Sequence, residues 1–165
     1  MAYEIQDDNT FEATLPLGKV QLSILYEMED RELKVLLLQA KGVVCQTNRN
    51  TANVYAKVLL TKDTEGNKLT SDRSTKVQRM SSEPQFNQEF SFCVNEVEII
   101  YAKVEVRLYE MDAFSKSYPL GQTRINMKDV DITQRMTGWF DLFEEEEEVW
   151  WLVAWIVCTV SKELI

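Results

Sequence analysis

The sequence contains no histidine, and this absence narrows the chemistry it can support. Histidine is the commonest general base and a member of the usual nucleophile triads. The glycine-rich signatures of nucleotide-binding loops and the GxSxG signature of hydrolases are also absent. The acidic run at 144–148 is contiguous, unlike the separated carboxylate pair of a glycosidase. These absences predict a protein that is not an enzyme.

Glycine, proline and cysteine are scarce. Five glycines and three prolines in 165 residues exclude a linker or a low-complexity chain. The three cysteines form no CxxC motif, which argues against a disulfide framework and a structural zinc site and suits a reducing cytosol. Residues 1–8 lack a basic region followed by an apolar one, so no signal peptide is predicted. We therefore expect a cytoplasmic protein.

Positive charge is in deficit. The net charge is −9. Residues 144–165 hold six of the 27 carboxylates and one of the 18 cations, so the remainder still carries −4. An acidic body is repelled by nucleic acid and by anionic lipid unless a local basic patch overrides the repulsion. The sequence therefore predicts no nucleic-acid partner.

What the chain does have is strand periodicity. From Val20 to Tyr26 apolar residues alternate with others, a pattern typical of a half-buried strand. Short segments rich in β-branched and aromatic residues predict an all-β, eight-stranded antiparallel sandwich. We expect its strands at 20–26, 33–40, 53–61, 74–79, 88–94, 103–110, 119–125 and 138–142, and one short helix at 127–134 capped by Asn126.

The predicted domain spans residues 18–143, between a flexible leader at 1–17 and a tail at 144–165. The tail consists of five glutamates followed by an apolar run at 149–160. That run is shorter than the roughly 20 residues needed to cross a bilayer, and it lacks the polar face of an interfacial helix. Three interpretations stay open: an alternative or truncated chain end, an additional packed strand or helix, and a short tail anchor.

Three segments carry a family resemblance. Residues 83–92 read Glu-Pro-Gln-Phe-Asn-Gln-Glu-Phe-Ser-Phe, with aromatics alternating at Phe90 and Phe92. Thr-Lys-Val at 75–77 lies upstream, and Leu-Tyr-Glu-Met-Asp-Ala-Phe-Ser-Lys at 108–116 lies downstream. In this order the segments resemble a C2 domain of the synaptotagmin kind, and the resemblance extends from Leu17 to Leu142. It implies a C2-type β-sandwich that docks on membranes, usually through calcium, and a longer form with a second C2 domain in place of this tail.

The resemblance also implies calcium ligands that this sequence has mostly lost. Aspartates on two loops hold calcium in such domains. The corresponding positions here are Thr47, Asn53, Glu110, Asp112 and Tyr118. Only Asp112 is unchanged, and calcium needs six to eight oxygen ligands with carboxylates among them. The sequence predicts no metal and no other cofactor. Glu110 and Asp112 are interpreted as solvated loop charges, with a weak single calcium site as the alternative.

Further residues are candidates for membrane or partner contact. Phe114 matches a loop-tip residue that inserts into lipid in calcium-binding relatives, or it folds back onto the sandwich edge; Lys116 follows it. Relatives carry a lipid-binding basic stripe where this chain has Lys68, Arg73, Lys76 and Arg79. The acidic residues Asp63, Glu65 and Asp72 dilute that stripe, which favours a solvated strand face, since each basic residue near an anionic surface contributes only about 1 kcal/mol.

The combined reading is a calcium-independent binding module that acts as an adaptor in vesicle trafficking and exocytosis. The implied partners are proteins of the trafficking machinery, such as other C2 domains and syntaxin-type fusion proteins, with anionic phospholipid as a further candidate. The implied location is cytoplasmic, including peripheral attachment to the cytosolic face of a vesicle or the plasma membrane. One alternative is a weak calcium-dependent phospholipid binder, and another is a regulatory C2 domain of a larger signalling protein.

Overall fold

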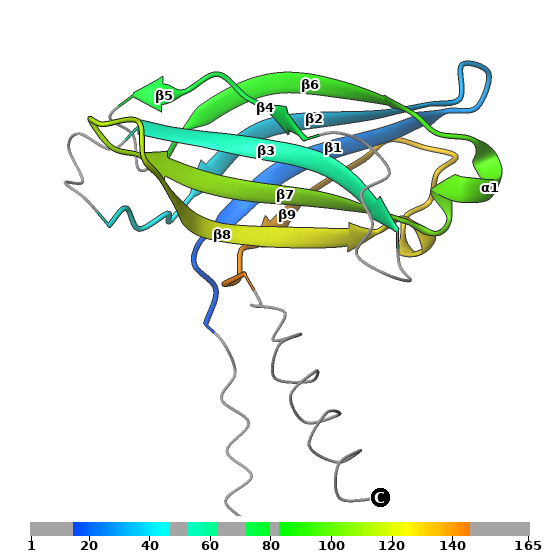
Figure 1. Ribbon diagram of the computed structural model, residues 1–165. Helices are drawn as coiled ribbons and strands as arrows, with labels where there is room; N and C mark the ends of the chain where they lie inside the picture. The colour runs from blue at the N-terminus through cyan, green and yellow to red at the C-terminus, as the bar shows by residue number, and fades with distance from the viewer. Residues whose placement is uncertain (1–14, 47–52, 63–71, 80–82, 146–165) are drawn as a thin grey trace, which may run out of the picture.

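The computed structural model describes residues 15–46, 53–62, 72–79 and 83–145, which form two stacked antiparallel sheets (Figure 1). The first sheet has the order β6-β2-β1-β9, and the second has the order β4-β3-β7-β8, with β5 also pairing to β3. The strands of the first sheet are β1 (Lys19–Glu27), β2 (Glu32–Lys41), β6 (Gln85–Cys93) and β9 (Met136–Asp141). Those of the second are β3 (Asn53–Lys62), β4 (Arg73–Ser74), β5 (Gln78–Arg79), β7 (Ala102–Met111) and β8 (Ser117–Asn126). The predicted all-β antiparallel sandwich is confirmed.

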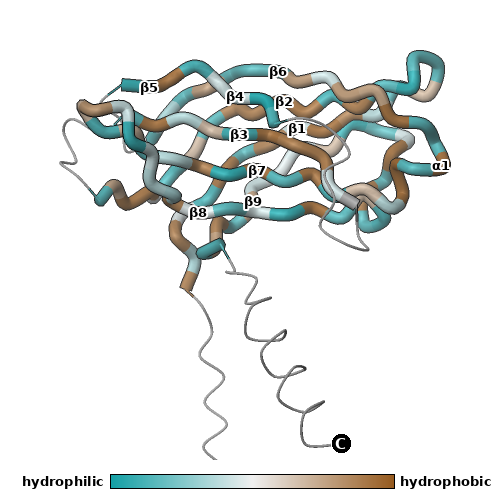
Figure 2. The backbone as a smooth tube through the Cα atoms, viewed as in Figure 1, coloured by the Kyte–Doolittle hydropathy of each residue, from teal (hydrophilic) through white to brown (hydrophobic). Residues whose placement is uncertain are grey.

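The core lies between the two sheets and follows the alternation in the sequence. In β1 the side chains of Val20, Leu22, Ile24 and Tyr26 are buried, as the period of two predicts. Phe92 on β6 is completely buried, and its neighbour Phe90 is almost so. Figure 2 shows hydrophilic and hydrophobic residues alternating along the strands, with one continuous hydrophobic stretch in β3. That stretch is the buried run Val58–Leu60.

The strand predicted at 74–79 is divided into β4 and β5. Lys57 pairs with Ser74 and Val54 pairs with Gln78, so one extra residue lies between the two short pairings. Thr75 occupies this bulge: its N–H donates to the Ala56 carbonyl, and its Oγ1 accepts from the Ala56 N–H. The side chain therefore takes the place of a ladder acceptor, and the strand bends there.

The prediction of a helix at 127–134 is wrong. Only the 3₁₀ turn η1 (Met127–Asp129) forms, and Asn126 makes no side-chain capping bond. Asp131 instead accepts hydrogen bonds from the N–H and hydroxyl of Thr133, and this local bonding competes with helix propagation. A helix does occur before β7, at α1 (Glu96–Ile99). Asn95 caps it by accepting from the Val97 and Glu98 N–H groups, so the Asn-x-x-Glu pattern was the available signal.

The two ends of the described domain meet at the edge of the sandwich. The Leu17 N–H donates to the Leu142 carbonyl at 2.7 Å, and the Leu142 N–H donates to the Gly18 carbonyl at 2.8 Å. Gly18 has φ +113°, and a Cβ there would lie 2.8 Å from the Lys41 carbonyl oxygen, so glycine is required. Phe143 then pairs with Gln122 of β8, which ties the second sheet to the end of β9.

The predicted leader and tail lie largely outside the residues that the structure describes. Of the predicted leader, residues 1–14 lie outside the described ranges, and so do residues 146–165 of the tail. The leader, the domain boundaries and the interpretations of the tail stay predictions. Within the ranges that are described, no helix combines the length and the hydropathy needed to cross a membrane.

Candidate functional site

The β7–β8 loop, residues 112–116, is organised by its own carboxylate. Asp112 Oδ1 accepts hydrogen bonds from the N–H groups of Phe114 (2.8 Å) and Lys116 (2.9 Å). Its Oδ2 accepts from the Tyr118 hydroxyl at 3.2 Å. The Lys116 hydrogen bond, helped by those from Phe114 and Tyr118, holds the pKa of Asp112 below its usual range. These internal donors stabilise the shape of the loop.

Glu110 is not a solvated loop charge, and that interpretation was wrong. The residue is fully buried, because alternation along β7 turns it inward with Val106 and Leu108. Its Oε2 accepts a hydrogen bond of 2.7 Å from the N–H of Gln46, which follows β2. Burial, with the Glu110 charge nearby, raises the pKa of the Cys45 thiol. Glu110 thus ties β7 to the segment after β2.

Two of the four described residues at the family's calcium positions, Asn53 and Tyr118, offer no carboxylate. Thr47 lies outside the described residues, and Asn53 is a neutral, half-buried residue at the start of β3. Tyr118 places a phenol ring opposite Glu110 across the β7–β8 pair, and the Lys116 ammonium lies 5.2 Å from the centre of that ring. A cation beside the site opposes a second cation. Among the residues the structure describes, no group of three or more Asp, Glu, Cys or His residues could hold a metal ion.

The tip of the β7–β8 loop points into solvent. Phe114 is 92% exposed, so of the two orientations open from the sequence the structure has the outward one. Lys116 is exposed beside it. Val44, two residues before Gln46, is another exposed apolar side chain that the sequence reasoning missed. An aromatic ring held outward by a fixed loop, with a cation adjacent, can contact a surface that offers apolar and anionic groups.

The predicted basic stripe is spread along the edge of the second sheet. Lys68 lies outside the described residues, while Arg73, Lys76 and Arg79 are exposed. Asn53 pairs with both Arg79 and Met111, so Arg79 lies at the same end of the sandwich as the β7–β8 loop. Arg73 lies farther along, with its guanidinium 4.8 Å from the centre of the Phe92 ring. It therefore covers the edge of the core as well as carrying charge.

The outer face of the second sheet holds a cluster that sequence reasoning missed. The rings of Tyr55 and Tyr109 stack with centroids 5.4 Å apart, and the Lys57 ammonium lies 5.2 Å from the centre of the Tyr109 ring. The Tyr55 hydroxyl shares a 2.8 Å hydrogen bond with Ser117. Only the strand register brings these side chains together, because they come from three different strands.

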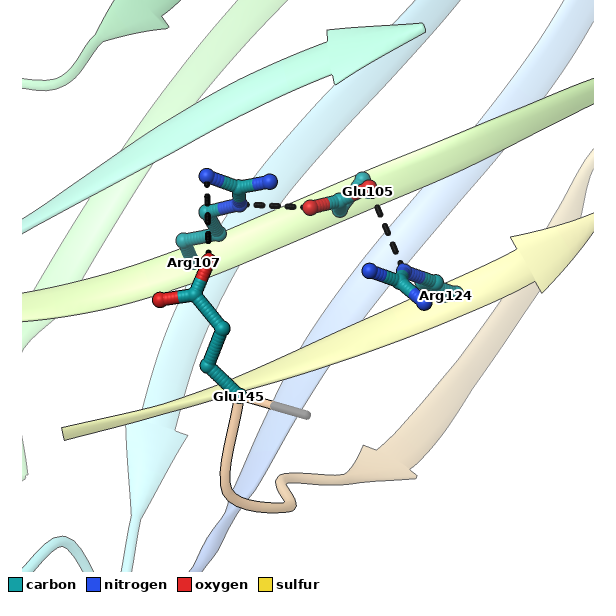
Figure 3. A network of polar contacts seen from close by, with 4 residues as sticks. All are labelled: Glu105, Arg107, Arg124 and Glu145. Carbon is teal, nitrogen blue, oxygen red and sulfur yellow. Dashed lines mark hydrogen bonds and ion pairs between the residues drawn. The ribbon is translucent and has the colours of Figure 1, made fainter. Parts of the chain in front are cut away.

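Beside this cluster lies a network of charged side chains (Figure 3). Glu105 of β7 pairs with Arg107 on its own strand and with Arg124 on β8. Arg107 also pairs with Glu145, just after β9, at 3.4 Å. The arginines on this face are therefore partly neutralised by carboxylates, which lowers the attraction of the sheet face for anions.

This two-sheet architecture matches a known protein family. A family model described as C2 domain matches residues 31–142. Synaptotagmin-B of Diplobatis ommata is 33% identical over 132 residues, covering 80% of this chain and 29% of that protein. Synaptotagmin-2 of Mus musculus is also 33% identical over 132 residues, covering 80% of this chain and 30% of that protein. The chain thus spans less than a third of the length of these curated relatives.

A solved structure supports the same fold. The crystal structure of the RIM C2A domain from Drosophila is similar with a TM-score of 0.67 at 24% identity, covering 78% of this chain and 99% of that domain. The two-sheet sandwich, the family match over residues 31–142 and the synaptotagmin relatives agree with one another. The chain belongs to the C2 domain family, and its relatives include synaptotagmins.

Proposed function

We propose that this chain is a calcium-independent C2 binding module that acts as an adaptor in vesicle trafficking and exocytosis. Membrane or protein binding is the general role of its family, and calcium independence is the specific part of the proposal. The observation that carries it is the state of Asp112, whose carboxylate already accepts hydrogen bonds from Phe114, Lys116 and Tyr118. These hydrogen bonds occupy most of the lone pairs of the carboxylate, and a calcium ion would also have to tolerate the Lys116 charge.

The proposed contact surface is the loop end of the sandwich, with Phe114 at its centre, Lys116 in the same loop and Arg79 at the same end of the second sheet. The Asp112 hydrogen bonds order the loop backbone with the Phe114 ring outward before any ligand arrives, so little backbone conformational entropy is lost on binding. The two cations favour an anionic surface. We propose that the surface engages proteins of the trafficking machinery and anionic phospholipid, at the cytosolic face of a vesicle or the plasma membrane.

The test is co-sedimentation of the full chain with vesicles of phosphatidylcholine alone or mixed with phosphatidylserine, in calcium or in chelator. We expect binding to the mixed vesicles to be the same in both conditions. Phe114→Ser should reduce it, whereas Met28→Ser, an exposed apolar residue in the β1–β2 turn, should leave it unchanged. Binding that rises in calcium would refute the calcium-independent mechanism. Calcium-independent binding that is equally strong in wild type and Phe114→Ser would refute the proposed contact surface.

A second measurement does not depend on knowing the partner. A ligand that binds the folded state raises its stability in proportion to ln(1 + [L]/Kd). We therefore expect the melting temperature to be the same in 1 mM calcium, 1 mM magnesium and chelator, to within about 1 °C. A shift of several degrees that is specific to calcium would show an ion site and favour the weak calcium-dependent alternative.

A further inference from the structure

Three apolar side chains are exposed on the helical turn that precedes β7. Val97 is 74% exposed, Ile100 is 43% exposed and Tyr101 is 58% exposed. They occupy positions i, i+3 and i+4 of α1 and its continuation, and such positions lie on one face of a helical turn. We name these three residues the α1 patch. An exposed apolar patch that is rimmed by polar residues is a candidate interaction site.

The α1 patch is held in a fixed orientation by its surroundings. Ile99 is completely buried and anchors the turn from its inner side. Asn95 caps the start of the helix, and the Val94 N–H donates to the Arg31 carbonyl at 3.0 Å. The Tyr26 hydroxyl donates to the Val94 carbonyl at 2.9 Å. These anchors use none of the three exposed side chains, so the fold does not need the patch to be apolar.

The rim of the patch is anionic. Glu96 lies exposed in the same helical turn, and the adjoining β1–β2 turn contributes the exposed Glu29 and Asp30 together with one cation, Arg31. The Val94–Arg31 hydrogen bond brings these two turns together. Burial, and then the Glu96 charge, raise the pKa of Tyr26, while Arg31 opposes this shift. A partner must therefore bring positive charge around an apolar centre.

This combination selects among possible occupants. An anionic membrane is repelled by the carboxylates around the patch. A second copy of the chain would set the same carboxylates against each other across a two-fold axis, because such an interface joins identical surfaces. We propose that the α1 patch docks a basic amphipathic helix of a partner protein, with its apolar side chains against Val97, Ile100 and Tyr101. Its lysines or arginines would face the exposed carboxylates Glu29, Asp30 and Glu96.

The position of the patch fits simultaneous binding of two ligands. Ala102, the first residue of β7, follows the patch directly, and Met111, the last residue of β7, directly precedes the β7–β8 loop. The patch and Phe114 therefore lie at opposite ends of a 10-residue strand, about 30 Å apart. A helix bound at α1 leaves the loop end accessible. The inference does not rest on the proposed function of the loop end, because it uses different residues.

The test uses a labelled 18-residue synthetic peptide in which leucines form one helical face and lysines the rest. Fluorescence anisotropy with the full chain should show binding that weakens as salt increases, because the charges are exposed. The double variant Val97→Ser/Tyr101→Ser should weaken it by about tenfold or more. Glu29→Gln/Glu96→Gln should also weaken it and reduce its dependence on salt. A scrambled peptide of the same composition, without an apolar face, should bind at least about tenfold less tightly.

Matched controls keep the result interpretable. The double variant should retain the wild-type melting temperature, because its side chains are exposed, and Phe114→Ser should bind the peptide as the wild type does. Equal binding by wild type and Val97→Ser/Tyr101→Ser, or by the two peptides, would overturn the proposal. Self-association or anionic-vesicle binding that the double variant abolishes would also overturn it, by assigning the patch to a second copy or to a membrane.

Discussion

Replacing Glu105 tests whether the charged network on the outer face of the second sheet stabilises the fold. Glu105 is only 2% exposed, while its partners Arg107 and Arg124 are 24% and 40% exposed (Figure 3). The change Glu105→Gln keeps the size of the side chain but removes its charge. The two arginines then lose the carboxylate that lies between them, although each remains in contact with water.

The expected cost follows from these exposures. Breaking a buried ion pair costs about 3–5 kcal/mol, whereas an exposed pair contributes about 0–1 kcal/mol. Glu105 is buried, whereas Arg107 and Arg124 are partly exposed, so the cost should lie between these two ranges. We expect Glu105→Gln to lower the free energy of unfolding by about 2 kcal/mol. Arg124→Gln should cost less than about 1 kcal/mol, because Arg124 is the more exposed partner and Glu105 keeps Arg107.

The assay is urea denaturation followed by tryptophan fluorescence, with the transition slope checked for constancy. Glu144→Gln is the matched control, because Glu144 is exposed just after β9. The variants Glu105→Gln and Arg107→Gln, with their combination, complete a cycle that isolates the coupling between the two side chains, expected at about 1 kcal/mol. A Glu105→Gln variant as stable as Glu144→Gln, or zero coupling in the cycle, would refute the reasoning.

Three further predictions address the core and the loop end. Phe90→Ala should cost about 3–5 kcal/mol while Ser91→Ala costs almost nothing, and equal shifts in the unfolding midpoint would contradict the β6 register. The pKa of Asp112 is lowered on folding, so its stabilising effect is present above about pH 4 and is lost as the pH falls through the folded-state value. The stability difference between wild type and Asp112→Asn should therefore shrink on acidification, and a difference that grows would refute this role. A variant with aspartate at the other four calcium positions should melt at a lower temperature than the wild type in chelator and regain stability in calcium; these positions are Thr47, Asn53, Glu110 and Tyr118. No stabilisation by calcium would show that the loop backbone has diverged as well as its ligands.

Much of the fold could be predicted from local pattern. Alternation from Val20 to Tyr26 gave both a strand and its buried face, because the period of a strand is a property of the backbone. The same rule also places the Glu110 side chain on the inner face, yet this carboxylate, the last residue of the predicted strand at 103–110, was interpreted as a solvated loop charge. Its partner, the Gln46 N–H, is 64 residues away in sequence, and no local pattern shows such a contact.

The candidate site was predictable in its residue types and not in its geometry. The sequence identified Asp112 and Phe114, but the direction of the Phe114 ring depends on the internal bonding of the loop and on the left-handed Ser115 (φ 62°). The contact of Lys57 with Tyr109 needs the β3–β7 register, which is set by the whole sheet. The Asn95 cap was a local signal, and with it the helix that carries the α1 patch could have been found.

The meeting of the two chain ends at Leu17 and Leu142 also determines how the domain responds to mechanical load. A pull through both ends acts first on the Arg107–Glu145 ion pair and the Gln122–Phe143 pairing. It then acts on the hydrogen bonds between Leu17, Gly18 and Leu142, along the direction of those bonds. The β1–β9 ladder would then open one pair at a time, from Lys19–Asp141 toward Ile24–Met136. Peeling bonds in succession requires less force than shearing a whole ladder at once. Tension between the flanking segments would thus detach β9 and open the core from its edge at low force.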